Sequence, residues 1–213
     1  MAATLTPHAI TRVQSLAMMT YYAGDHKEAE PLLDKTVRMG LDSKMFDPQT
    51  LVLLAFTRLE LNDRKGLQRC YDDFLRLQER QSDNPRLLRL TAIVQTLNLI
   101  MQSQFAASVE SVRQLCKAIR TPEFDFESAS NLVALMCHLA TRSIQLDEVD
   151  AVISTLGLRF CNNRSLTELL AGSSKLHPSY EARLRDCQTK VLEMAEVAMS
   201  LSMSGNPTAA VKN

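Results

Sequence analysis

Residues 23–33 read AGDHKEAEPLL, and this stretch predicts a turn followed by a new helix. Asp25 is an N-cap residue, and Glu28 stands three positions later, where its side chain reaches back to complete a capping box. Similar helix-start signals occur further along the chain, at Asn62-Asp63, Ser103 and Asp147. The same kind of helix start therefore recurs along the chain.

Proline marks a second set of helix starts. An N-cap residue followed by proline is a strong signal, because proline at the first helical position loses no hydrogen bond. A period in the high thirties is typical of arrays of helical hairpins. The signal occurs at Thr6-Pro7, Asp47-Pro48 and Asn84-Pro85, and Pro7, Pro48, Pro85 and Pro122 are separated by 41, 37 and 37 residues.

These signals predict an all-α chain, since helix-forming residues fill the long segments and alternating strand patterns are absent. Residues 1–158 are expected to hold four degenerate helix-turn-helix repeats. Residues 159–213 are expected to continue the same domain with an irregular connector, a long C-terminal helix and a truncated further repeat. The predicted helices are 7–23 with 26–39, 48–61 with 64–81, 85–102 with 104–120, 126–143 with 147–158, then 179–203 and a start at Gly205-Asn206-Pro207.

The pairs resemble the tetratricopeptide repeat, whose first helix carries large and small apolar residues and whose second carries small ones. This resemblance implies a TPR-like solenoid, a right-handed superhelical array of antiparallel helix pairs with about 9–11 helices. It also implies that a protein or peptide binds on the concave surface. The first copy reads Val13, Leu16, Ala17, Gly24, Ala29 and Leu33, and the second keeps Leu51, Leu54, Ala55 and Tyr71 but has Asn62 and Leu67 where the family prefers glycine and alanine.

Charge and cysteine content argue against several classes of function. Lys plus Arg and Asp plus Glu both number 24, so no net charge draws the chain to nucleic acid or to an anionic membrane. No uninterrupted stretch of about 18 apolar residues occurs, so no membrane insertion is expected. The five cysteines are widely spaced, without a CxxC pair or zinc spacing, which suits reduced side chains in a cytoplasmic protein.

The first helix of each predicted pair is apolar on most sides and has one thin polar stripe, so neighbours should bury most of it. We expect the stripe to face the concave groove. The alternative is that these residues face ordinary solvent or satisfy hydrogen bonds between helices. Arg58 and Gln95 each lie 11 residues after their capping residues, which predicts equivalent positions. The expected partner-binding groove consists of Gln14, Arg58, Gln95, Asn98, Asn131, His138 and Arg142.

An apolar seam runs along residues 179–203, with members alternately 4 and 3 residues apart, as in a coiled coil. The seam either packs on the preceding helices, forms a dimer contact, or awaits a further repeat. If the seam is internal, Met199 and Met203 are left exposed, and we expect self-association into a homodimer through this helix. The seam consists of Tyr180, Leu184, Cys187, Val191, Met194, Ala198 and Leu201.

Signals of catalysis are lacking, because the sequence has no Gly-rich phosphate loop, no GxSxG and no HExxH. The residues that share a helix face with His138 are not usual metal ligands. The acids Glu123, Asp125 and Glu127 fit the favourable dipole at a helix N-terminus. We therefore expect no enzymatic activity, no cofactor and no metal.

The expected function is a non-enzymatic scaffold for protein–protein interaction that holds a peptide or a partner helix in its groove. The alternative is a helical regulatory or sensor region of a larger signalling protein, where it positions or controls an output domain. A fused output domain in the full-length gene would favour the alternative.

Overall fold

The computed structural model of the chain describes residues 7–41, 46–118, 121, 124–140, 142 and 144. The chain divides into two compact units, Met1–Leu146 and Asp147–Asn213, and every described residue lies in the first. The described residues form helices and no strand, which confirms the all-α prediction for this part of the chain. The helices are α1 (Pro7–Tyr22), α2 (His26–Gly40), α3 (Pro48–Glu60), α4 (Arg64–Arg80), α5 (Pro85–Met101), α6 (Phe105–Lys117) and α7 (Phe126–Ala140).

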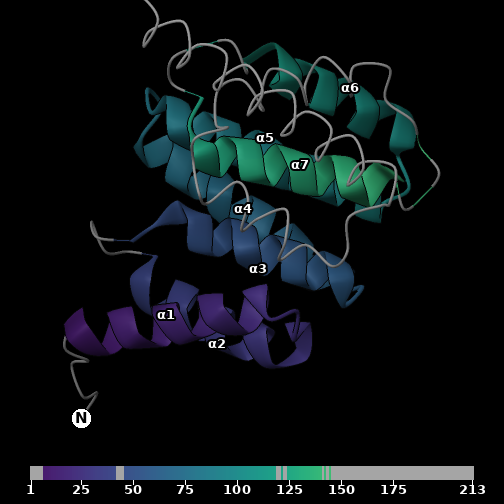
Figure 1. Cartoon of the computed structure of the whole chain (residues 1–213). Coiled ribbons are helices and arrows are strands. Elements are labelled where there is room, and N and C mark those ends of the chain that lie inside the picture. The colour runs from purple at the N-terminus through teal and green to yellow at the C-terminus, as the bar shows by residue number, and fades with distance from the viewer. Residues whose placement is uncertain are drawn as a thin grey trace, which may run out of the picture. The chain divides into compact units, whose positions relative to one another are not determined.

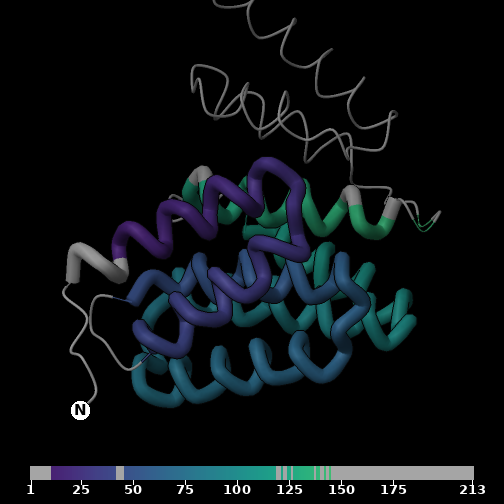
Figure 2. The backbone as a smooth tube through the Cα atoms, turned by 90° about the horizontal axis from the view of Figure 1, so that it is seen from below, coloured from purple at the N-terminus to yellow at the C-terminus, as the bar shows by residue number. Residues whose placement is uncertain are grey.

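Consecutive helices pack as neighbours, and the hairpins α1–α2, α3–α4 and α5–α6 are stacked in chain order (Figure 1). Within this stack α1 contacts α3, and α3 contacts α5. Helix α7 continues this row by packing against both α5 and α6. The same succession is visible from another side in Figure 2. None of the described helices is long and apolar enough to cross a membrane.

The core lies around α3 and α5. Every residue of α3 from Gln49 to Leu59 is buried, which fits a helix with apolar residues on all sides. Helix α5 contributes a second set of buried residues, which are distributed between Leu87 and Ile100. Helices α2, α4 and α6 bury one face each and expose the other, so they form the outer layer of the stack.

The three hairpins close through the same backbone turn. Each turn places one residue in the left-handed region, with φ of 84° at Gly24, 56° at Asn62 and 60° at Ser103. In each turn the next N–H donates to the carbonyl five residues back, which defines a Schellman motif. These bonds join Asp25 to Thr20 at 3.2 Å, Asp63 to Arg58 at 2.8 Å and Gln104 to Leu99 at 2.9 Å.

The predicted caps Asp47 and Asn84 are confirmed, whereas Thr6 and Asn206 lie outside the described residues. Pro48 and Pro85 lie in the first turns of α3 and α5. The Asp47 carboxylate accepts the Gln49 N–H at 3.2 Å, and the Asn84 side chain accepts the Leu87 N–H at the same distance. Predicted and observed helix ends agree within three residues throughout α1 to α7. The predicted segments 147–158, 159–177 and 179–203, with the further repeat, lie outside the described residues.

The left-handed turn residues predict opposite effects of two substitutions. Ser103→Gly should raise the free energy of unfolding by about 1 kcal/mol, because a residue with a Cβ is strained at this φ. Gly24→Ala should lower it by about the same amount, although a Cβ at Gly24 meets no atom within 4 Å. Chemical denaturation of both variants and wild type measures the difference. A Gly24→Ala variant as stable as wild type would contradict this account.

Candidate functional site

Arg58, on α3, is buried, with 4% of its surface exposed, and its guanidinium joins three helices. Toward α2, its Nε and Nη2 donate to Glu30 at 3.1 and 2.9 Å, and Nη2 also donates to Asp34. Toward α4, its Nη1 donates to the Gly66 carbonyl at 3.2 Å and to the Cys70 sulfur at 3.3 Å. A buried cation needs this many partners, so Arg58 acts as a structural bridge.

The residues of α4 that receive Arg58 are adapted to its close approach. A Cβ added at Gly66 would lie 2.7 Å from Arg58 Cδ and would overlap the Asp63 carboxylate that caps α4. Burial raises the pKa of the Cys70 thiol to about 11, although the neighbouring Arg58 charge partly opposes this. Cys70 is therefore a protonated packing residue at neutral pH rather than a nucleophile.

Asn131 links α7 to α3 through a pair of buried amides. Its Nδ2 donates to Gln49 Oε1 at 3.0 Å, and Gln49 Nε2 donates back to Asn131 Oδ1 at 3.1 Å. These residues are 82 positions apart in the chain, and each is at most 6% exposed. The amide pair therefore holds α7 directly against α3, beside its contact with α5.

A second bridge secures the N-terminal end of α7. Arg86, on α5, donates from Nε and Nη2 to the two Glu127 carboxylate oxygens at 2.9 and 2.7 Å. Its Nη2 also donates to the cap residue Asp47 at 2.8 Å. Glu127 thus does more than complement the helix dipole, because a two-point ion pair also fixes the orientation of α7. Asp125 takes the capping role by accepting the Ser128 N–H at 2.8 Å.

Two more residues of the expected groove bond to neighbouring helices. Asn98 is 7% exposed, and its Nδ2 donates to Gln68 Oε1 on α4 at 2.7 Å. Gln14, which is half-buried, donates to Thr50 Oγ1 on α3 at 3.1 Å. Their polar groups therefore contribute to the packing of one helix on the next.

The last three residues of the expected groove are more open. His138 stacks on Phe56 with ring centroids 5.6 Å apart, and its Nε2 lies 3.8 Å from Glu60 Oε1. Gln95 is exposed on α5. Arg142 is exposed after α7, and its Nη1 donates to the His138 carbonyl at 2.8 Å.

The predicted equivalence of Arg58 and Gln95 is wrong. They stand at the same distance from their caps, yet Arg58 is enclosed by α2 and α4 whereas Gln95 is exposed. Arg58, Asn98 and Asn131 do not face an open groove, because their side chains are buried in hydrogen bonds between helices. Binding of a partner by the seven residues stays a prediction. The expected self-association residues, Met199 and Met203, lie outside the described residues.

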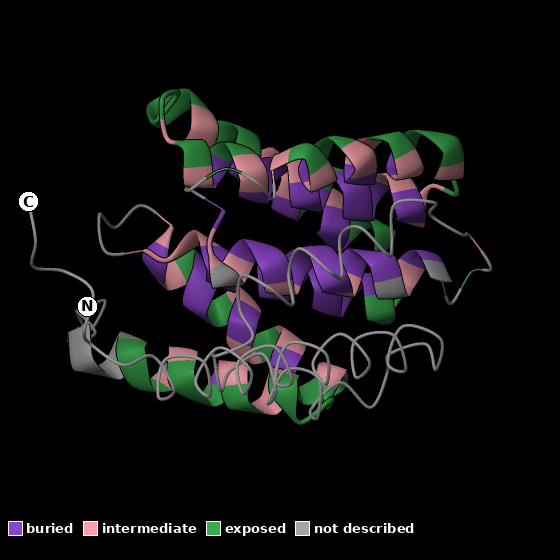
Figure 3. Ribbon diagram, turned by 45° about the horizontal axis from the view of Figure 1, so that its top comes forward, coloured by how far each residue is buried: buried purple, intermediate pink, exposed green. Residues whose placement is uncertain are grey.

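The largest exposed apolar feature in the described residues lies on α1. Leu16, Met19 and Tyr22 are 53%, 70% and 59% exposed, and they are three of the five exposed large hydrophobic side chains. The other two, Leu75 and Leu88, lie on different helices. Because Leu16, Met19 and Tyr22 are spaced by three, they share one side of α1. We call this side the α1 face; it consists of Arg12, Ser15, Leu16, Met19, Tyr22 and Ala23, all exposed (Figure 3).

The repeat pattern did not predict that Leu16 would be exposed on the α1 face. It assigned Leu16 to the same repeat position as Leu54, but Leu54 is 1% exposed. The opposite side of α1 is the packed one, since Ala17 is fully buried. Helix α1 is the first in the stack, so the described residues supply no preceding helix to cover its outer side. One feature of the sequence could have indicated this surface. Leu16, Met19 and Tyr22 are spaced by three, which places them together on the side of α1 opposite Ala17.

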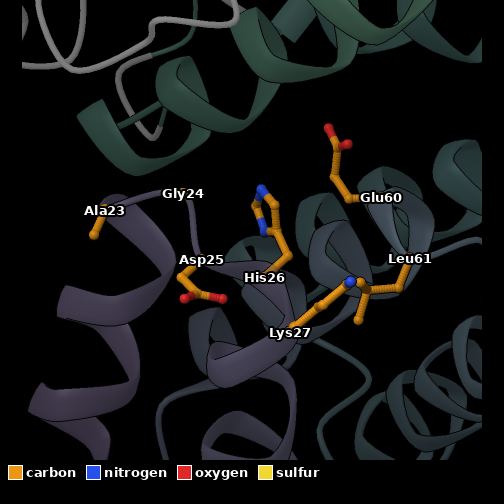
Figure 4. A pocket seen from close by; sticks show the side chains of 7 residues that line it. All are labelled: Ala23, Gly24, Asp25, His26, Lys27, Glu60 and Leu61. Carbon is orange, nitrogen blue, oxygen red and sulfur yellow. The ribbon is translucent and has the colours of Figure 1, made fainter.

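An open hollow of about 440 Å³ adjoins the end of the α1 face. Figure 4 shows the His26 ring and the Glu60 carboxylate directed toward the same side of it. Burial raises the pKa of nearby Tyr21, with Tyr22 and Glu60 adding to the effect, so its hydroxyl stays protonated. The hollow can receive a polar side chain beside the apolar stripe. Its lining is Ala23, Gly24, Asp25, His26, Lys27, Glu60 and Leu61.

Metal binding and similarity to known proteins give no further assignment. In the part of the chain that the structure describes, no group of three or more His, Cys, Asp or Glu side chains is placed to hold a metal ion. No protein-family model, no curated protein and no solved structure matches the chain. The tetratricopeptide resemblance therefore stays a prediction.

The Gln49–Asn131 pair predicts non-additive effects on stability. Asn131→Leu should lower the free energy of unfolding by about 1–3 kcal/mol, because it leaves the Gln49 amide buried and unpaired. Gln49→Met should do the same to Asn131. The double variant should cost less than the sum, since both amides are then removed together. Denaturation of all four proteins gives the coupling energy, and additive losses would refute the proposed pairing.

Arg58 should not tolerate replacement by lysine. Arg58→Lys retains the charge but loses the planar fork that serves α2 and α4, so we expect a loss of about 2–3 kcal/mol in unfolding free energy. Arg38→Lys is the matched control, because Arg38 also pairs with Asp34 but its side chain is 70% exposed. The control should stay within about 0.5 kcal/mol of wild type. Equal losses in the two variants would show that burial is not the cause.

Proposed function

We propose that this chain is a non-enzymatic interaction module that binds a partner helix along the α1 face. The observation that carries the proposal is the grouping of Leu16, Met19 and Tyr22, each more than half exposed, on one side of one helix. Scattered exposed hydrophobic residues are ordinary, but contiguous ones often mark a site of protein interaction. The proposal keeps the expected class of function and moves the binding surface away from the expected groove.

The form of the α1 face favours a helical partner. From Arg12 to Tyr22 the face is a straight strip about 16 Å long, which matches about three turns of another helix. Helices that bind in this way anchor through side chains spaced by three and four residues. Met19 lies at the middle of the apolar part of the strip, between Leu16 and Tyr22, while Arg12 and Ser15 offer polar contacts toward one end. The hollow beside Gly24 and Glu60 can receive a polar side chain at the other end.

The internal bonds of the polar stripe support this choice of surface. Arg58, Asn98 and Asn131 already bond to residues of this chain, so a partner would have to break those bonds to reach them. Leu16, Met19 and Tyr22 require no such exchange. Binding on them would remove apolar surface from water at little structural cost.

The same proposal includes two finer features. The helix pairs form a right-handed superhelix of the tetratricopeptide kind, which the repeated hairpin turns at Gly24, Asn62 and Ser103 support. The protein works in the cytoplasm, which the widely spaced cysteines support.

Binding can be tested with three forms of the chain as bait in an extract of the native cell. Met19→Glu places a charge in the middle of the α1 face and should weaken capture of the partner by about tenfold or more. Leu88→Glu is the matched control, because it changes an exposed hydrophobic residue on α5 and should capture like wild type. A protein lost only with Met19→Glu is then purified and its affinity for all three forms is measured.

Equal thermal stability of the three baits is the required control. If wild type and Met19→Glu capture the same proteins with the same affinity, the α1 face is not the binding surface and the proposed function fails in this form.

A further inference from the structure

The charges around the α1 face are arranged asymmetrically along the helix. Arg12 is the single Asp, Glu, Lys or Arg residue of α1, and it is exposed near one end of the face. Three exposed charged residues, Asp25, Lys27 and Glu28, lie just beyond the other end, where α2 begins, so that end carries a net negative charge. Such a face is complementary to a second copy of itself in the antiparallel orientation. The apolar centres then meet, and the cation of each copy lies beside the carboxylates of the other.

We propose that the occupant of the α1 face is the α1 face of a second copy of this chain, packed antiparallel about a two-fold axis through Met19. This inference rests on the proposed function, because it names the partner for that surface. Such an isologous contact uses the same patch twice. It brings Met19 against Met19, Leu16 against Ala23 and Ser15 against Tyr22.

The helical positions agree with this arrangement. With 100° between successive residues, Arg12, Ser15, Leu16, Tyr22 and Ala23 lie within about 60° of Met19 around the helix. Residues equally far before and after Met19 lie at the same height in the two copies, and side chains meet where they also lie on the same side of the axis. Arg12 then lies toward the α1–α2 turn of the other copy, and its long side chain pairs with the exposed Asp25 carboxylate of that turn. Each dimer contains this ion pair twice.

A second copy matches the face at its centre and at both ends. A generic apolar partner would cover Leu16, Met19 and Tyr22 but would leave the charges at the two ends without a complement. The antiparallel dimer also opposes the two helix dipoles, which is favourable. The strip is small compared with a standard interface of about 800 Å² per partner, so the dimer should be reversible rather than permanent.

Sedimentation velocity of the full chain, from about 1 to about 200 µM, tests the association in the range expected for a weak contact. Wild type should shift from monomer to dimer across this range. Met19→Glu should raise the dissociation constant about tenfold or more, because it places two carboxylates on the axis. Leu88→Glu should behave like wild type. A wild type that stays monomeric throughout, or a dimer unaffected by Met19→Glu, overturns the proposal.

The ion pairs provide an independent check of the antiparallel orientation. Arg12→Glu should weaken the dimer, because it places a carboxylate opposite Asp25. Adding Asp25→Asn should recover part of the loss, because it removes that repulsion while asparagine retains the cap of α2. No recovery in the double variant contradicts the antiparallel pairing.

Disulfide formation tests the position of the axis. Met19→Cys should form a covalent dimer under mild oxidation, because the two copies of residue 19 meet on the axis. Ser15→Cys is the control, since its two copies would lie about 12 Å apart along the helices, beyond disulfide reach. The native cysteines are common to both variants. Equal crosslinking of the two variants rejects an axis at Met19.

Failure of the dimer and failure of the proposed function give different results. If the chain is monomeric but Met19→Glu loses a captured protein, the α1 face binds another protein and the second-copy proposal is rejected alone. If Met19→Glu changes neither self-association nor capture, both proposals are rejected.

Discussion

The buried guanidinium of Arg58 is the interaction on which the packing of the first two hairpins depends. It sits in α3, a helix buried on all sides, and carries a charge that the interior tolerates only with partners. Glu30 and Asp34 from α2 supply the opposite charges, while Gly66 and Cys70 from α4 accept its remaining hydrogen bonds. One side chain therefore sets how α2, α3 and α4 meet.

Two further polar contacts extend this principle to α7. The Gln49–Asn131 amide pair and the ion pairs of Arg86 hold α7 against α3 and α5. Buried polar groups of this kind specify one arrangement of the helices, because any other arrangement leaves them unpaired. Because they are held in these internal bonds, side chains such as Arg58 and Asn131 are not open to a partner. The binding surface that we propose therefore lies elsewhere, at the exposed hydrophobic side chains of α1.

The proposed role of α1 follows from the exposure of its outer side, which no other described helix covers. In a stack of helical hairpins each repeat is covered by its neighbours, and an end repeat usually has a polar outer face for solubility. The exposed Leu16, Met19 and Tyr22 give the first described helix an apolar outer side instead. Among the described residues, their exposure makes α1 the helix on which burial of apolar area would gain the most free energy. A partner bound there would cover the outer side of the first described hairpin.

The sequence by itself determined the helix boundaries, because caps and turns are local. Asp47 and Asn84 bond to amides within three residues, so their role is readable from the residues beside them. Tertiary structure alone decided which polar side chains are buried. Gln49 and Asn131 meet across 82 positions, and the burial of Arg58 depends on acids from another helix. The local sequence pattern does not predict such partners, because residues far apart in the chain are brought together only by the packing of the helices.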